Sequence, residues 1–173
     1  AQQLLEAVTL SSRYELDLKK AGGLLFNASY TKNLEHESIS FEGDEAIDLL
    51  NRPGYSSDPH YKANASVTWS RDRLGTTLYA NHMGPTPNNR AITVDNYTAA
   101  LTGKLSSYTT YNLSMNYAFT EALDVSLMVN NLFNSMPPFD PTYPGSSGAP
   151  YNSAQYSVFG RAIYLEARYD LGK

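Results

Sequence analysis

Residues 111–129 give the clearest indication of the fold, and their sequence is Tyr-Asn-Leu-Ser-Met-Asn-Tyr-Ala-Phe-Thr-Glu-Ala-Leu-Asp-Val-Ser-Leu-Met-Val. Apolar and polar side chains alternate over Tyr111–Phe119 and again over Val125–Val129, and a Thr-Glu-Ala turn joins the two runs. A period of two is typical of a β-strand with one apolar face. The first run is longer than the usual strand of about five to six residues and has about the length of a strand that crosses a bilayer. The stretch therefore predicts a membrane-spanning antiparallel hairpin.

Similar runs occur along most of the chain. Five further strands are predicted, at residues 8–18, 24–33, 61–70, 76–83 and 160–171. Four of them alternate clearly, whereas the pattern over 76–83 does not fix which side chains share a face. With the hairpin they give about seven antiparallel strands and an all-β fold.

The predicted connections alternate between short and long. Residues 19–23, 71–75 and 120–122 are short turns, whereas 35–59, 84–107 and 134–156 are long loops rich in Pro, Gly or acidic residues. We expect one helical turn in the first loop, starting at Asp44. Outer-membrane barrels have short periplasmic turns and long extracellular loops, and a soluble sandwich has no reason to sort loops in this way. The pattern favours an up-and-down transmembrane β-barrel segment whose residue 1 lies at the extracellular end and whose last strand ends in the periplasm.

Composition excludes several other classes. The net charge is −4 and the pI is near 5.3, so no basic surface is available for nucleic acid. The chain contains no Cys and no apolar run of eighteen residues, which excludes disulfides, thiolate metal sites and a transmembrane helix. A mean hydropathy of −0.41 remains compatible with a barrel, because only alternate residues face lipid.

No catalytic or metal motif is present. The three histidines, His36, His60 and His82, are too far apart in sequence to pair on one strand or helix face, and no Gly-x-Ser-x-Gly elbow occurs. We therefore expect no enzyme activity, no cofactor and no metal site.

Candidate ligand contacts are aromatic residues in the long loops, which either stack on a ligand ring or pack the loops together. The residues singled out are Tyr55, Tyr97, Phe139, Tyr143 and Tyr151, with Phe41 and Tyr156 as further loop aromatics. In the last run we expect Arg161, Glu166 and Arg168 to face the barrel lumen.

The last part of the chain resembles the end of a TonB-dependent outer-membrane receptor. The resemblance rests on the hairpin 111–134 with its Asn130-Asn131-Leu132-Phe133-Asn134 step, on the Pro- and Gly-rich loop, and on Gly160-Arg161 before a strand ending Tyr169-Asp170-Leu171. Arg52-Pro53-Gly54-Tyr55 before a strand also resembles a late loop of such receptors. The chain departs from the family in ending Leu171-Gly172-Lys173 rather than on an aromatic residue.

The resemblance implies that residues 1–173 are the C-terminal part of a barrel of about 22 strands, without the plug domain. The implied function is uptake of a scarce ligand such as an iron siderophore across the bacterial outer membrane. The implied partners are outer-membrane lipid, the plug and earlier strands, and TonB indirectly through the plug. Two alternatives remain: a small complete outer-membrane barrel acting as an anchor or adhesin, and a soluble carbohydrate-binding β-sandwich.

Overall fold

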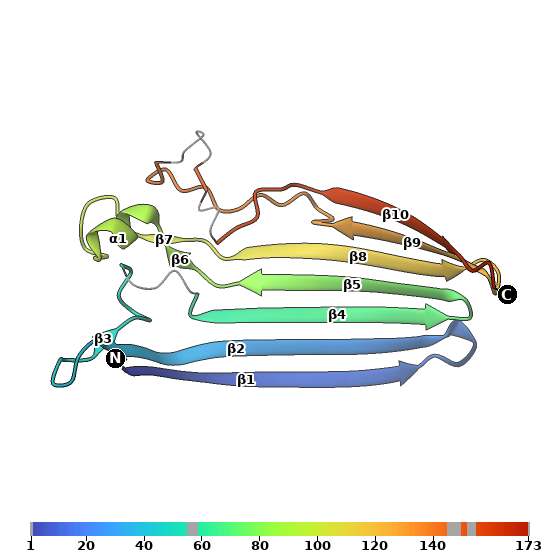
Figure 1. Cartoon of the computed structure of the whole chain (residues 1–173), viewed down its shortest axis with the longest axis horizontal. Coiled ribbons are helices and arrows are strands. Elements are labelled where there is room, and N and C mark those ends of the chain that lie inside the picture. Colours follow the sequence, from blue (N-terminus) through green and yellow to red (C-terminus); the bar gives the residue numbers. More distant parts are fainter. Residues whose placement is uncertain (1, 55–58, 145–149, 152–154, 173) are drawn as a thin grey trace.

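A single curved antiparallel sheet forms the wall of the molecule (Figure 1). The computed structural model describes residues 2–54, 59–144, 150–151 and 155–172. The seven long strands are β1 (Gln2–Asp17), β2 (Gly23–Ile39), β4 (Tyr61–Arg71), β5 (Leu74–Met83), β8 (Tyr108–Ala118), β9 (Leu123–Asn130) and β10 (Ala162–Tyr169). Each pairs with its neighbours along the chain in the order β1-β2-β4-β5-β8-β9-β10, which confirms the predicted up-and-down arrangement of seven strands.

Small elements occupy the connections. A 3-10 helix, η1 (Lys19–Ala21), turns β1 into β2, and β3 (Ile47–Asp48) pairs with the end of β2. In the second long connection, β6 (Thr86–Pro87) precedes the helix α1 (Asn89–Val94), and β7 (Lys104–Leu105) follows it and pairs with β6. Within the described residues, no helix is long and apolar enough to cross a membrane.

Two expectations for the first loop are wrong. The loop begins at residue 40 rather than 35, because β2 continues to Ile39 by pairing with the start of β1, and Glu35 and Glu37 therefore lie in a strand. No helical turn starts at Asp44, whose carboxylate instead accepts the backbone N–H of Phe41 in a tight turn. The helix lies in the second loop, at Asn89, where the side chain of Asn88 caps it.

Long and short connections lie at opposite ends of the sheet (Figure 1). We call residues 40–60, 84–107 and 131–161 the first, second and third loops. Their described parts lie at the end of the sheet where β1 begins. The three short turns and the C-terminus lie at the other end.

The strand register places apolar side chains on one face of the sheet and polar side chains on the other. Laterally paired residues form rows that run across all seven strands and share one face of the sheet. One apolar row is Tyr14, Phe26, Val67, Leu78, Leu113, Val129 and Ile163, and a polar row on the opposite face is Asp17, Gly23, Ser70, Gly75, Asn116, Ser126 and Glu166. The register also gives β5 its facing, with Leu78 on the apolar face, which the sequence pattern left open.

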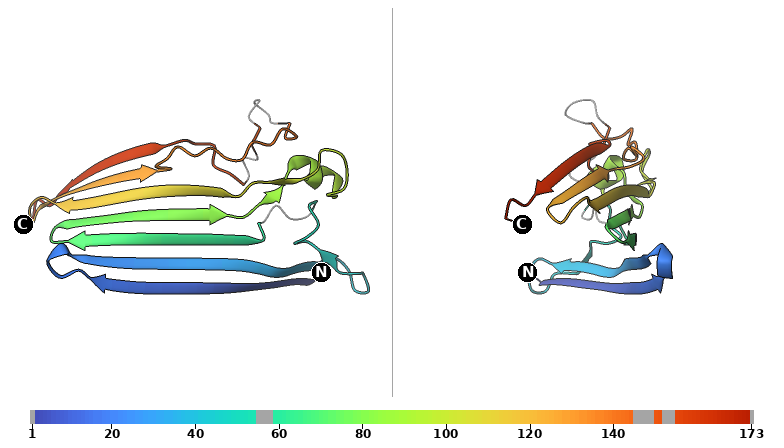
Figure 2. Two further views of the ribbon diagram at one scale, coloured as in Figure 1. Left: turned by 180° about the vertical axis from the view of Figure 1, so that it is seen from behind. Right: turned by 90° about the vertical axis from the view of Figure 1, so that its right-hand side faces the viewer.

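The sheet is curved rather than flat (Figure 2). Along β2, Phe26, Ala28 and Tyr30 of the apolar face are exposed, whereas Asn27, Ser29 and Thr31 of the polar face are half-buried. The pairing of β1 with β2 also contains one bulge, between Glu6 and Ala7, which leaves Leu34 as the extra residue of β2.

Buried side chains gather in the loops rather than in the wall. The largest fully buried side chains are Thr86, Asp140 and Pro59, all of them loop residues or residues of the small strands between loops. The apolar face of the wall is open, with Leu165 76% and Ile163 64% exposed. Such a surface is unsuited to water and suited to lipid.

Candidate functional site

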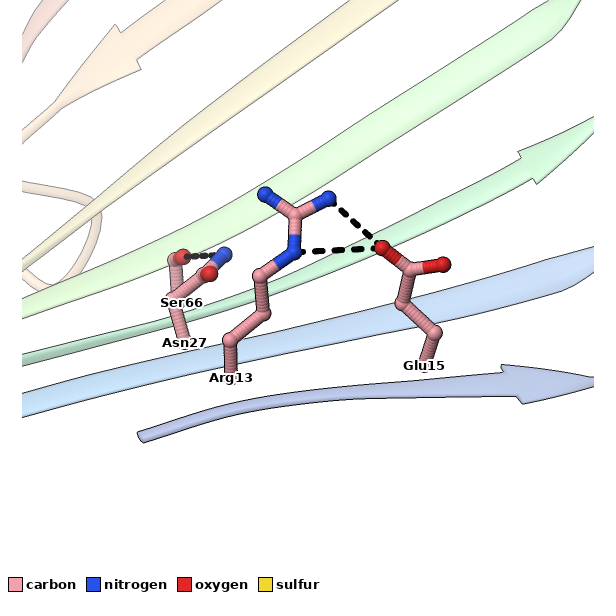
Figure 3. Close-up of polar contacts among 4 residues, drawn as sticks. All are labelled: Arg13, Glu15, Asn27 and Ser66. Carbon is pink, nitrogen blue, oxygen red and sulfur yellow. Dashed lines mark hydrogen bonds and ion pairs between the residues drawn. The ribbon is translucent and has the colours of Figure 1, made fainter. Parts of the chain in front are cut away.

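The polar face of the sheet carries polar and charged side chains, four of which are drawn in Figure 3. Arg13 and Glu15, both on β1, form an ion pair of 2.6 Å, and Asn27 on β2 donates to Ser66 on β4 at 3.4 Å. Side chains of this kind bond to one another and leave space for water beside them. The face therefore suits the wet interior of a barrel.

The second and third loops are joined around the carboxylate of Asp140, which is 2% exposed. One of its oxygens accepts the backbone N–H of Asn89 at 2.7 Å, and the other accepts the backbone N–H and the hydroxyl of Thr142 at 2.9 and 2.6 Å. The Thr142 hydroxyl oxygen in turn accepts the N–H of Arg90 at 3.0 Å. The third loop thus accepts the first two backbone N–H groups of α1, those of Asn89 and Arg90.

A buried tyrosine makes a second joint between these loops. Tyr156 is 3% exposed; its hydroxyl bonds to that of Thr86 at 2.9 Å, and its ring packs edge-on against Tyr108 with 5.7 Å between ring centres. Burial raises the pKa of Tyr156, so it stays protonated at neutral pH. Together with the Asp140 contacts, this makes the second and third loops one packed unit.

The first and second loops meet at Asp95, which follows α1. The Asp95 carboxylate accepts a bond from Nε of Arg52 at 2.9 Å, a second bond from the same guanidinium, and the backbone N–H of Gly54 at 2.8 Å. The Arg52 hydrogen bond, followed by that from Gly54, lowers the pKa of Asp95 below its ordinary 3.8. All three long loops are therefore connected through the second.

The loop end offers no metal site among the described residues, where no three His, Asp or Glu side chains converge. Burial, followed by the charge of Lys104, lowers the pKa of His60 below its ordinary 6.5. His60 is therefore neutral at pH 7. The long loops also present aromatic rings, amides and hydroxyls, which bind ligands by stacking and hydrogen bonding.

A comparison with known protein families identifies the family to which this sheet belongs. The family model of the TonB dependent receptor-like β-barrel matches residues 6–132, more than half of the chain. The chain belongs to this family.

Solved structures of TonB-dependent receptors have the same fold. A mutant of the ferric enterobactin receptor from Pseudomonas aeruginosa, in complex with enterobactin, is 20% identical with a TM-score of 0.61 and matches 95% of this chain and 22% of its own. The siderophore receptor PiuA from Acinetobacter baumannii is 16% identical with a TM-score of 0.52 and matches 93% of this chain and 21% of its own. The chain thus spans about a fifth of the length of these receptors. No curated protein sequence matches it.

The predicted aromatic residues of this TonB-dependent receptor segment fall in different surroundings. Phe139 is 64% exposed, whereas Tyr97, Tyr143 and Tyr151 are half-buried. Lys104 Nζ lies 5.2 Å from the centre of the Tyr97 ring and covers one face of it. Tyr55 lies outside the described residues. A role of these five residues in ligand binding stays a prediction.

The predicted lumen-facing residues separate into two groups. Glu166 pairs with Ser126 and Arg168 with Asp124, so both lie in β10 on the face of the polar row. Arg161 lies before β10; its backbone N–H donates to Asn134 at 2.9 Å and its guanidinium to the carbonyl of Leu132 at 3.4 Å. Their role toward the lumen stays a prediction.

The residues that connect the loops were missed in the sequence. Nothing in the sequence singled out Asp140 or Asp95, because their partners are 51 and 43 residues away. One local signal was available for the helix: Asn88 followed by a short helical segment is typical of an N-cap.

Proposed function

We propose that residues 1–173 form the C-terminal part of the barrel of a TonB-dependent receptor, in a bacterial outer membrane, that takes up an iron siderophore. The plug, the earlier strands and TonB would belong to the remainder of such a receptor. The apolar face contacts lipid and the polar face lines the lumen. The observation that carries this proposal is the open seven-stranded sheet, with one apolar and one polar face, that matches structures of siderophore receptors over 93 to 95% of its length.

The loop end supports a role in ligand capture. Three joined loops give a stable rim, and the exposed ring of Phe139 projects from it. Aromatic faces suit a siderophore that carries aromatic rings. The function requires binding and passage without any covalent step, so we assign no enzyme activity.

The two alternatives fit less well. A small closed barrel requires its first and last strands to pair, and in the described residues β1 and β10 each have one neighbour. A sandwich requires a second sheet over the apolar face, and the only other sheet among the described residues is the two-residue pair β6–β7.

The test is uptake of iron-loaded enterobactin by cells that carry the complete receptor containing this chain, with and without TonB. We expect TonB-dependent uptake, and Phe139→Ala should weaken binding of iron-loaded enterobactin while leaving the amount of receptor unchanged. The matched control is Phe133→Ala, because Phe133 is equally exposed but packs on Tyr111 of the apolar face. Equal binding by both variants argues against ligand contact at Phe139, and absent uptake of any iron chelate argues against the function.

A further inference from the structure

The contact between the first and second loops has the form of a clasp, which we define as residues 52–54 around the Asp95 carboxylate. Arg52 holds one carboxylate oxygen through two nitrogens, and the Gly54 N–H holds the other. Paired donors of this kind fix both position and direction of a carboxylate.

The clasp is also closed sterically. A Cβ on Gly54 would lie 2.7 Å from Cβ of Asp95, so only glycine allows the backbone this close. On its own side, Asp95 sits at the end of α1 with φ of 48°, and its N–H donates to the carbonyl of Ile92 at 3.3 Å. The carboxylate is therefore held in place by the helix, and the first loop docks onto it.

The two loop joints differ in exposure. Asp140 is 2% exposed and holds the third loop, whereas the side chains of Asp95 and Arg52 are 24% and 47% exposed. Salt screens an exposed ion pair and affects a buried one much less. The first loop is therefore attached to the second by the weaker and more salt-sensitive joint.

The base of the first loop has a separate attachment. β3 pairs with β2, and the Leu49 N–H donates to the carbonyl of His36 at 2.7 Å. The backbone N–H groups of Asn51 and Arg52 also donate to Asp48 of β3, at 3.0 and 3.3 Å. Release of the clasp would therefore free Gly54 while residues 49–52 stay in place.

We propose that Asp95 is a positioning residue: it holds Arg52 and Gly54 of the first loop against the second loop through a releasable clasp, while the second and third loops remain one unit. An effect on ligand capture rests on the proposed function; the opening itself does not.

The test is hydrogen–deuterium exchange of the complete receptor in detergent, without ligand, at low and high salt. In the wild type, exchange of the Gly54 amide, which donates to Asp95, should be slow at low salt and rise several-fold at high salt, while the amides of residues 49–52 keep their protection. In the Asp95→Asn variant, the same Gly54 amide should exchange fast at both salt concentrations, so that the salt dependence disappears. Residues 86–94 and 138–143 should keep their protection.

Two further variants make the test specific. Gly54→Ala retains every charge and should open the contact by pushing the carboxylate away. Asp44→Asn removes an equal charge from the first loop but only a local turn contact, and should behave as the wild type. The proposal is overturned if Asp95→Asn leaves exchange of the Gly54 amide unchanged, or if residues 86–94 and 138–143 open together with it. Because no ligand is present, these outcomes are independent of the uptake assay.

Discussion

An arginine on the outer face of β4 should disrupt the wall, whereas an arginine one residue earlier should not. Val67 belongs to the apolar row and Ser66 to the opposite face. β4 has 11 residues with Ser66 at its centre. Val67→Arg and Ser66→Arg therefore place the same charge at the same height in the membrane and differ only in facing.

The magnitude follows from the position of Val67. One residue along a strand tilted by roughly 40° is about 2.5 Å from the centre, in an apolar band about 25 Å tall. Arginine facing lipid near the midplane costs about 2–4 kcal/mol. At about 1.36 kcal/mol for each tenfold change, that cost lowers the folding equilibrium constant by about 30-fold to 900-fold. Ser66→Arg loses only a 3.4 Å hydrogen bond and should cost less than about 1 kcal/mol.

The assay is guanidinium unfolding of the complete receptor in lipid vesicles, with the folded fraction read from resistance of the barrel to SDS without heating. We expect a clearly lower midpoint for Val67→Arg and a near wild-type midpoint for Ser66→Arg. Equal midpoints, or the reverse order, would refute the assignment of the apolar face to lipid.

Three further predictions concern the loops. Asp140→Ala should cost about 3–5 kcal/mol of local stability, because three donors lose a buried carboxylate, and exchange at the start of α1 should rise with no change in the strands. Tyr156→Phe should cost about 1 kcal/mol by removing one buried hydrogen bond, seen as a small fall in the exchange protection of residues 86–88. The side-chain bond from Asn51 lowers the pKa of Asp48 below its ordinary 3.8, so its stabilisation is complete above pH 3.8 and is lost as the pH falls through the lower folded value. A nitroxide on a cysteine introduced at Glu45 should gain mobility only below pH 3.8, and mobility that rises with pH would contradict this sign.

The wall could be predicted from the sequence because its pattern is local. Alternation over residues 111–119 fixes facing without knowledge of any partner, and the lengths of the connections give the order of strands. The strand pairing confirms which side chains share a face in six strands. It also assigns the faces of β5, where the adjacent Thr76 and Thr77 obscure the alternation of apolar and polar residues.

The loop end could not be predicted in the same way. The partners of Asp140 and Asp95 come from other loops, and only a three-dimensional arrangement brings them together. The extension of β2 was hidden for a related reason. The bulge at Leu34 shifts the alternation by one residue, so Glu35 and Glu37 look like loop acids although they are paired with β1.

The bulge between Glu6 and Ala7 also divides the first hairpin, β1 and β2, into two parts. Below it, β1 and β2 keep apolar side chains on one face; above it, five pairs join Gln2–Glu6 to Glu35–Ile39, and Glu6 stands opposite Glu35. Two facing carboxylates do not belong in hydrocarbon. In the proposed barrel, the first hairpin would therefore leave the hydrocarbon near residue 34 and continue in water, where the end of β2 pairs with β3.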